Sequence, residues 1–326
     1  MPSTRCSGRF DRDRWRIFGQ TDTGDLDADQ GMLNQALADA VTVRFFMPSP
    51  QVAPYISTYY LTDFALPKGQ EVEDWLHPEW ANLRIWDRQA SRIGIGGEQL
   101  SKAPQVIATG PTSQTGHFVA SQARVWGVGI LPLGWARFID APAARFADSV
   151  CDAQTEPAFA RLSPLFGEVF GNQADPAAEA ARIDAYFCDL IERFPPHEDE
   201  ARIRAAHTAL LDDAVTSVTE LADRLGMSSR SLERLSLRAF GFSPKLLLRR
   251  QRFLRSLAQF MLDPSLTWIK TLDCHYVDQA HFVRDFRRFM AMSPSAYAAV
   301  DHPVLRSAAR ARAVATGAAV QALHQP

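Results

Sequence analysis

Four polar side chains share one face of a helix that the sequence predicts to run up to Leu235. They are Ser229, Arg230, Glu233 and Arg234. Leu232 and Leu235 fall on the opposite face, so we expect the polar face to be exposed. An arginine can bond guanine O6 and N7 bidentately, and a glutamate can accept from cytosine N4. This face therefore has the chemistry to read base pairs in a major groove.

The residues before this helix predict a tight turn between two helices. Ala222 is small enough for close helix contact, and Gly226, four residues on, tolerates the positive φ of a turn. Ser228 stands where the next helix needs an N-cap oxygen. The segment 218–235 thus predicts a helix-turn-helix. An ordinary helical hairpin with a solvated charged face shares the Ala-x-x-x-Gly pattern, so this unit alone leaves both interpretations open.

A second unit of the same kind follows at residues 266–297. Phe282, Phe286 and Phe289 recur at i, i+4 and i+7, which predicts the inner face of a helix, and Asp278 is its expected N-cap. The opposite face carries polar residues, namely Gln279, His281, Arg284 and Arg288. Each unit is followed by a Ser-Pro helix start. This repetition favours paired DNA-reading motifs over a chance hairpin.

The carboxy-terminal third of the chain is basic. Residues 202–300 hold 15 Lys+Arg and 9 Asp+Glu, a net +6, whereas residues 1–201 hold 17 and 27, a net −10. A helix predicted between the two units, Leu246–Leu262, carries four arginines. We expect two of them, Arg249 and Arg250, to contact phosphates whatever the base sequence.

Residues 202–300 resemble the DNA-binding domain of the AraC/XylS family of transcription regulators. The strongest likeness is the run 278–289 together with Ser293, Pro294 and Tyr297. The resemblance implies two motifs that are joined by a long helix and read successive major-groove segments on one side of the DNA. By position it implies two base-reading sets: Arg230, Glu233 and Arg234, then Gln279, Ala280, His281 and Arg284.

The second motif departs from the family pattern at three positions. His275 and Ala291 stand where the family usually has glycine, and Thr271 where it usually has alanine. A residue with a side chain in a left-handed turn costs roughly 1 kcal/mol. We therefore expect the second motif to be less stable or differently angled.

The amino-terminal half predicts a different architecture. Short β-type runs fall at Val41–Phe46, Ile56–Phe64, Asn82–Trp86, Gln105–Thr109 and Arg124–Leu131, and helical spacing follows near 133–147, 156–170 and 176–194. The predicted fold class is α+β, with a mainly β sheet or barrel domain and flanking helices, then an all-α domain. The predicted divisions are a flexible arm (1–40), a sensor or oligomerisation domain (41–196), the double helix-turn-helix domain (200–300) and a basic, Ala-rich tail (301–326), which fits either a helix or an unstructured end.

Two features of the amino-terminal domain suggest binding chemistry. Asp74, His77, Glu79 and His117 could ligate a metal, but they lack tight ligand spacing, so ordinary loop roles are favoured. Five tryptophans could line an apolar pocket, with core packing as the default; they are Trp75, Trp80, Trp86, Trp126 and Trp135. No catalytic set or nucleotide fingerprint can be placed, which argues against an enzyme with an accessory helical tail. The exposed arginines argue against a pure protein-interaction module.

The remaining expectations concern compartment and partners. The charged amino terminus and the lack of any apolar run of about eighteen residues predict a cytoplasmic protein that does not enter a membrane. Four scattered cysteines predict neither a disulfide framework nor a zinc site, and no cofactor or metal is expected. The expected partner is double-stranded DNA. RNA polymerase, a small-molecule effector and a second copy of the chain are further candidates.

Overall fold

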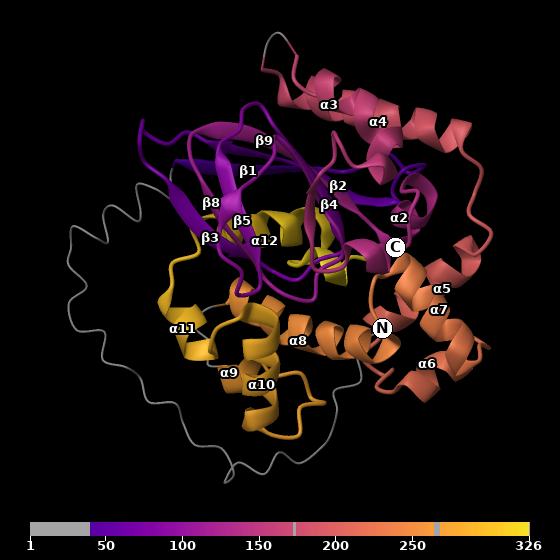
Figure 1. Cartoon of the computed structure of the whole chain (residues 1–326). Helices are drawn as coiled ribbons and strands as arrows, with labels where there is room; N and C mark the ends of the chain where they lie inside the picture. The colour runs from indigo at the N-terminus through magenta and orange to yellow at the C-terminus, as the bar shows by residue number, and fades with distance from the viewer. Residues whose placement is uncertain (1–39, 172–173, 264–267, 326) are drawn as a thin grey trace, which may run out of the picture.

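The structure, a computed structural model, describes residues 40–171, 174–263 and 268–325 (Figure 1). The arm expected at 1–40 lies outside the described residues except for Ala40. An amino-terminal β domain and a helical carboxy-terminal domain follow one another, as the sequence predicts. None of the helices within the described ranges is long and apolar enough to cross a lipid bilayer.

The β domain consists of two antiparallel sheets. The larger has the order β1-β2-β9-β4-β7-β10 (Val41–Phe46, Ile56–Phe64, Ala123–Ile130, Ala81–Trp86, Val106–Thr109 and Val150–Asp152). The smaller has the order β3-β8-β5-β6 (Val72–Leu76, Gly116–Ala120, Ser91–Ile95 and Ser101–Lys102). Phe64, Trp86, Ile93 and Phe118 pack between the two sheets as an apolar layer. The five β-type runs read from the sequence all become strands of the larger sheet.

Helical segments follow the last long strand. They are α2 (Pro132–Phe138), the 3-10 turns η2 (Ala143–Phe146) and η3 (Pro157–Leu162), α3 (Ser163–Glu168) and α4 (Pro176–Arg193). In α4, Ile183 and Phe187 are fully buried, and Phe187 stacks on Tyr59 of β2. Buried Glu179 accepts hydrogen bonds from Trp126 and Arg124 of β9 at 2.8 and 2.7 Å. Helix α4 is therefore fixed on the outer face of the larger sheet.

The helical domain is built around α8. Its elements are α5 (Glu200–Leu211), α6 (Val218–Arg224), α7 (Ser229–Ala239), α8 (Pro244–Leu262), α9 (Trp268–Thr271), α10 (Gln279–Met290) and α11 (Pro294–Ala299). Helix α8 runs between the pair α6–α7 and the pair α9–α10 (Figure 1). Its fully buried Leu247, Phe253 and Leu257 form the core that both pairs share.

The chain then returns to the β domain. Helix α12 (Pro303–Thr316) packs against β1 and β3 and is followed by the 3-10 turn η4 (Gln321–Leu323). The carboxylate of Asp74 in β3 accepts hydrogen bonds from the first backbone N–H groups of α12, those of Val304 (3.0 Å) and Leu305 (2.8 Å), and it lies 2.8 Å from the His302 ring. A buried carboxylate at a helix start stabilises both partners. The carboxy-terminal segment is therefore part of the β domain.

The residues considered as metal ligands have separate partners. Asp74 caps α12, His77 Nε2 lies 2.8 Å from the Tyr297 hydroxyl, Glu79 pairs with Arg84 at 2.7 Å, and His117 pairs with Glu73 at 2.5 Å. Trp80, Trp126 and Trp135 are fully buried core residues, and Trp75 stacks on His117. Core and loop roles thus account for these side chains, and Trp86 is the one tryptophan among the five that lines the cavity described below.

Ala291, one of the two non-glycine departures, adopts the left-handed conformation. It is the C-cap of α10, with φ +57 and ψ 9, and its methyl group is exposed. We expect Ala291→Gly to raise the free energy of unfolding by about 1 kcal/mol, because glycine removes the Cβ strain and no packing is lost. Chemical denaturation monitored by circular dichroism measures this change.

The matched control is His275→Gly. His275 has no positive φ, and its backbone N–H and ring both contact Asp273. This variant should be destabilised. Equal stabilisation of both variants would contradict the assignment of strain to Ala291.

Two buried histidines make stability sensitive to acid. Burial, the largest effect, lowers the pKa of His77 and of His207 to about 3; His302 adds to the shift at His77, and His324 and Arg250 add to it at His207. Below the ordinary pKa of 6.5 the unfolded chain takes up protons that the folded chain excludes. The free energy of unfolding should therefore fall as pH drops from 6.5, by about 1.4 kcal/mol per pH unit for each histidine. Denaturant unfolding at pH 7.5, 6, 5 and 4.5 measures this slope.

His207→Met removes one of the two titrating groups. His207 Nε2 has no partner among the described residues, and the ring contacts Trp80 and Phe240, so an apolar side chain is tolerated. The variant should lose about half of this contribution to the slope between pH 6.5 and 4.5. An unchanged slope would show that His207 is protonated in the folded protein.

Candidate nucleic-acid interface

The first motif is fixed by local caps and a glycine turn. At the start of α6, Ser217 and Glu220 form a capping box, and Leu221 and Ala222 are buried. Gly226 has φ +60, as the turn requires. The Ser228 hydroxyl then accepts from the Ser231 N–H at 3.2 Å and starts α7. The predicted turn and cap of this motif are confirmed.

The outer face of α7 is open. The side chains of Ser229, Arg230, Glu233 and Arg234 are all exposed. Leu232 and Leu235 are buried on the inner face. Within the described ranges, no acidic side chain forms an ion pair with Arg230 or Arg234. These guanidinium groups can therefore meet an incoming ligand without first breaking an internal ion pair.

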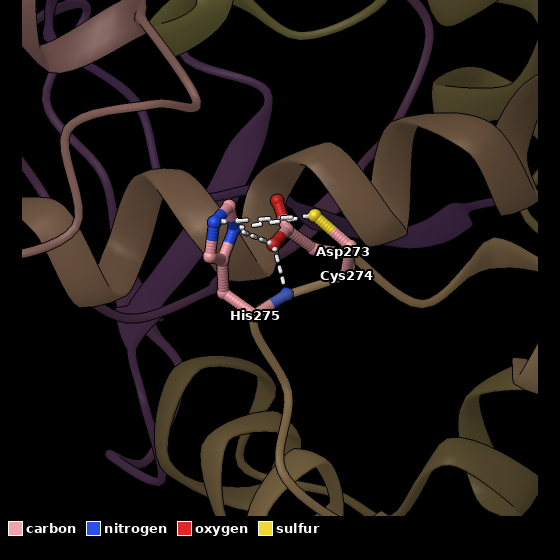
Figure 2. A group of neighbouring side chains, drawn as sticks. All are labelled: Asp273, Cys274 and His275. Atoms are coloured by element: carbon pink, nitrogen blue, oxygen red, sulfur yellow. Dashed lines mark hydrogen bonds and ion pairs between the residues drawn. The ribbon is translucent and has the colours of Figure 1, made fainter. Parts of the chain in front are cut away.

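The second motif turns without glycine at residue 275. Figure 2 shows how the Asp273 carboxylate closes the turn: its Oδ1 accepts from the His275 N–H at 3.0 Å and lies 2.9 Å from the His275 ring. An aspartate that accepts a hydrogen bond from the backbone N–H two residues later forms an Asx turn, which can take the place of a turn that needs glycine. The expected left-handed strain is therefore absent at His275 and present at Ala291. Thr271 is buried, and its hydroxyl donates to the Trp268 carbonyl at 3.0 Å.

The ligand-type atoms of Asp273, Cys274 and His275 lie within 4.8 Å of one another (Figure 2). The Asp273 carboxylate, however, is already paired with Arg255 at 2.5 Å, besides its bonds to His275. Arg255 and these bonds hold the pKa of Asp273 below its ordinary value against the effect of burial. These three residues are therefore explained by their role in the turn, which Arg255 and Asp273 stabilise.

Helix α10 has a buried aromatic face and a polar outer face. Phe282, Phe286 and Phe289 pack around Phe253 of α8, which confirms the predicted stripe. Asp278 accepts from the His281 N–H at 2.6 Å and is the N-cap, as predicted. The exposed side chains on this helix include Ala280, Arg284, Arg287 and Arg288. Arg287 is not among the residues predicted from the sequence, although its i, i+3 spacing from Arg284 indicates the same exposed face.

Gln279 and His281 are only half-buried at the start of the outer face. His281 lies 3.3 Å from Arg252 Nη2 and 3.9 Å from the Asp285 carboxylate. Burial, followed by the neighbouring arginines, lowers its pKa, and Asp285 acts in the opposite direction. A neutral ring at pH 7 can both donate and accept a hydrogen bond.

Three arginines of α8 brace the second motif. Arg249 pairs with the buried Asp285 of α10 at 2.5 Å, and Arg252 lies 3.8 Å from the same carboxylate. The Tyr276 hydroxyl also donates to Asp285, at 3.1 Å. Arg255 holds Asp273 in the turn. Arg249, expected to contact phosphate, is thus half-buried and paired with Asp285 of α10. The sequence does not predict the role of Asp285, because its arginine partners lie on another helix.

The expectation for Arg250 is corrected by the structure. Arg250 is fully buried at the junction of the two domains, where its Nη1 donates to the carbonyls of Thr112 (2.8 Å) and Glu79 (3.3 Å) and its guanidinium lies 4.0 Å from the Trp80 ring. Burial lowers its pKa to about 9. Four arginines on one helix cannot all face solvent, since successive residues point 100° apart, and Arg250 points to the β domain.

Comparison with known proteins identifies the helical domain. Residues 221–299 match a family model described as a helix-turn-helix domain. No curated protein matches the chain. Among solved structures, ToxT from Vibrio cholerae is 10% identical, with a TM-score of 0.40 over 70% of this chain and 97% of that one.

Two other solved structures also show low similarity. ToxT bound to (E)-4-(8-methylnaphthalen-1-yl)but-3-enoic acid is 10% identical, with a TM-score of 0.40 over 79% of this chain and 98% of that one. The AraC-like transcriptional activator CuxR is 14% identical, with a TM-score of 0.23 over 71% and 91%. The assignment rests on the family match and on the paired motif geometry: residues 221–299 form a helix-turn-helix domain, the kind of domain with which transcription regulators bind DNA.

Proposed function

We propose that α7 and α10 read two successive major-groove segments of double-stranded DNA in the cytoplasm. Arg230, Glu233 and Arg234 are the base-reading set of the first motif, with Ser229 beside them. Gln279, Ala280, His281 and Arg284 form the set of the second, with Arg288 beside them. The observation that carries the proposal is the pair of capped helices whose outer arginines form no ion pair within the described residues. Arg–guanine pairs give direct readout in the major groove.

We further propose that the β domain controls DNA binding in response to a small-molecule effector. Its contacts with the helical domain include three polar ones: Arg250 of α8 donates to the Thr112 carbonyl, the Thr115 N–H donates to the Phe289 carbonyl at 2.7 Å, and His77 lies 2.8 Å from the Tyr297 hydroxyl. These contacts lie on α10, on α11 and on α8, the linker helix between the two motifs, and α7 of the first motif packs against α2 and η2. A rearrangement of the β domain would therefore move one motif relative to the other.

Specific recognition is tested by removing one reading arginine at a time. Arg230→Ala and Arg284→Ala should each weaken binding to a selected duplex by roughly 1–3 kcal/mol and relax preference at the base pairs read. The duplex is obtained by selection from a random pool and binding is measured by gel shift. Arg238→Ala is the matched control, because Arg238 is exposed on α7 and lies 3.5 Å from Glu198. Unchanged specificity in both reading variants would refute the assignment.

The correction for Arg250 predicts a different salt response. An arginine that contacts a phosphate contributes about one unit to the slope of log affinity against log salt. Arg288→Gln should reduce that slope by about one on a random-sequence duplex, and Arg250→Met should leave it unchanged because the side chain is buried. Fluorescence anisotropy at several salt concentrations measures both. A reduced slope for Arg250→Met would show that Arg250 leaves the domain junction when DNA binds.

A further inference from the structure

A cavity of about 140 Å³ lies inside the β domain. Its walls come from both sheets and from α12, and most of its lining is apolar, including Val43, Phe64, Trp86, Ile93, Phe118 and Leu305. A dry cavity of roughly 150 Å³ holds a molecule the size of benzene. The space therefore fits an apolar group of roughly six to eight heavy atoms.

Among the described residues, one cation that faces this cavity forms no ion pair. Arg312 of α12 lines the cavity and is 5% exposed. Its Nη1 donates to the Thr58 hydroxyl at 2.7 Å, but among the described residues Nε and Nη2 have no hydrogen-bond partner. Unsatisfied buried donors on a charged group are costly, and they favour an acceptor that carries negative charge.

The other charged groups at the cavity are already paired. Arg84 binds Glu79 at 2.7 Å, and Arg92, at the more exposed edge, binds Glu71 at 2.7 Å. Arg312 is thus the charge in excess among the described lining residues. Burial lowers its pKa to about 10, which leaves the guanidinium protonated at pH 7.

We propose that this cavity binds a small organic monocarboxylate, whose apolar body fills the space between the sheets and whose carboxylate pairs with Nε and Nη2 of Arg312. A guanidinium edge matches a carboxylate with two parallel hydrogen bonds. The proposal deepens the effector control proposed above and rests on it for its regulatory meaning.

The segment that contains Arg312 connects the cavity to the DNA-binding domain. Helix α12 follows the second motif, and the Gln251 amide of α8 donates to the Ala322 carbonyl in η4 at 2.6 Å. A carboxylate bound to Arg312 satisfies the buried charge of α12. It should therefore stabilise the docking of the segment that contacts both the cavity and the linker helix.

Hexanoate and 1-hexanol are suitable probes, because they share the apolar chain and differ in charge. Isothermal titration of the full chain should show saturable hexanoate binding with a Kd on the order of 10 mM or tighter. Arg312→Met should weaken hexanoate binding roughly 10- to 100-fold and leave hexanol binding unchanged. Arg92→Gln, at the edge of the cavity, is the matched control and should bind hexanoate as the unmodified chain does.

Arg312→Lys is the second variant, in case Arg312→Met does not fold. It keeps the charge but loses the two-pronged geometry, so hexanoate binding should weaken by less than in Arg312→Met. The proposal is overturned if hexanoate does not bind, or if it binds no better than hexanol. It is also overturned if the folded Arg312 variants bind hexanoate as tightly as the unmodified chain.

Gel shifts with the selected duplex separate this proposal from the proposed function. Retained DNA binding without hexanoate binding refutes the carboxylate site alone. Hexanoate binding that leaves DNA affinity unchanged refutes effector control through this site and keeps the site itself. Loss of specific DNA recognition in the unmodified chain would refute the reading of DNA by α7 and α10.

Discussion

The arrangement of this molecule depends on the contacts that the arginines of α8 make. Burial of a guanidinium is costly unless acceptors or anions lie beside it. Arg249 and Arg252 meet Asp285, Arg255 meets Asp273, and Arg250 reaches carbonyl oxygens of the β domain. These contacts fix α10, the turn before it and the β domain on one helix. Helix α8 therefore holds these elements together, besides connecting the two motifs.

This constraint joins the two domains into one unit. Buried residues of the sheets, of α4 and of the helical domain belong to a single apolar cluster. Asp74 caps α12 from β3, so residues that are 230 positions apart depend on each other. The chain after the second motif completes the β domain. A structural change in the sheets would consequently act directly on the helical domain, because the two domains are in contact.

The second motif shows how a local departure can be compensated. At His275 the Asp273 side chain supplies the turn that glycine would otherwise supply, and Arg255 keeps that carboxylate charged and in place. At Ala291 nothing replaces glycine, and the backbone carries the strain of φ +57. The motif retains its aromatic core, because Phe253 contacts Phe282, Phe286 and Phe289 together. The polar face of α10 is thus presented on a well-packed helix.

The sequence by itself determined the features that depend on neighbours in the chain. The caps at Ser228 and Asp278, the turn at Gly226, the leucine and phenylalanine stripes and the longest strands all follow from spacing, because short-range geometry sets which residues share a face. It could not decide where Arg250, Asp285 and Arg312 point. Their partners lie on other elements, at Thr112, Arg249 and Thr58, and burial of a charge depends on groups that only the folded chain brings together. Tertiary structure alone therefore decided which arginines are free to meet DNA, which join the two domains, and which one faces the cavity.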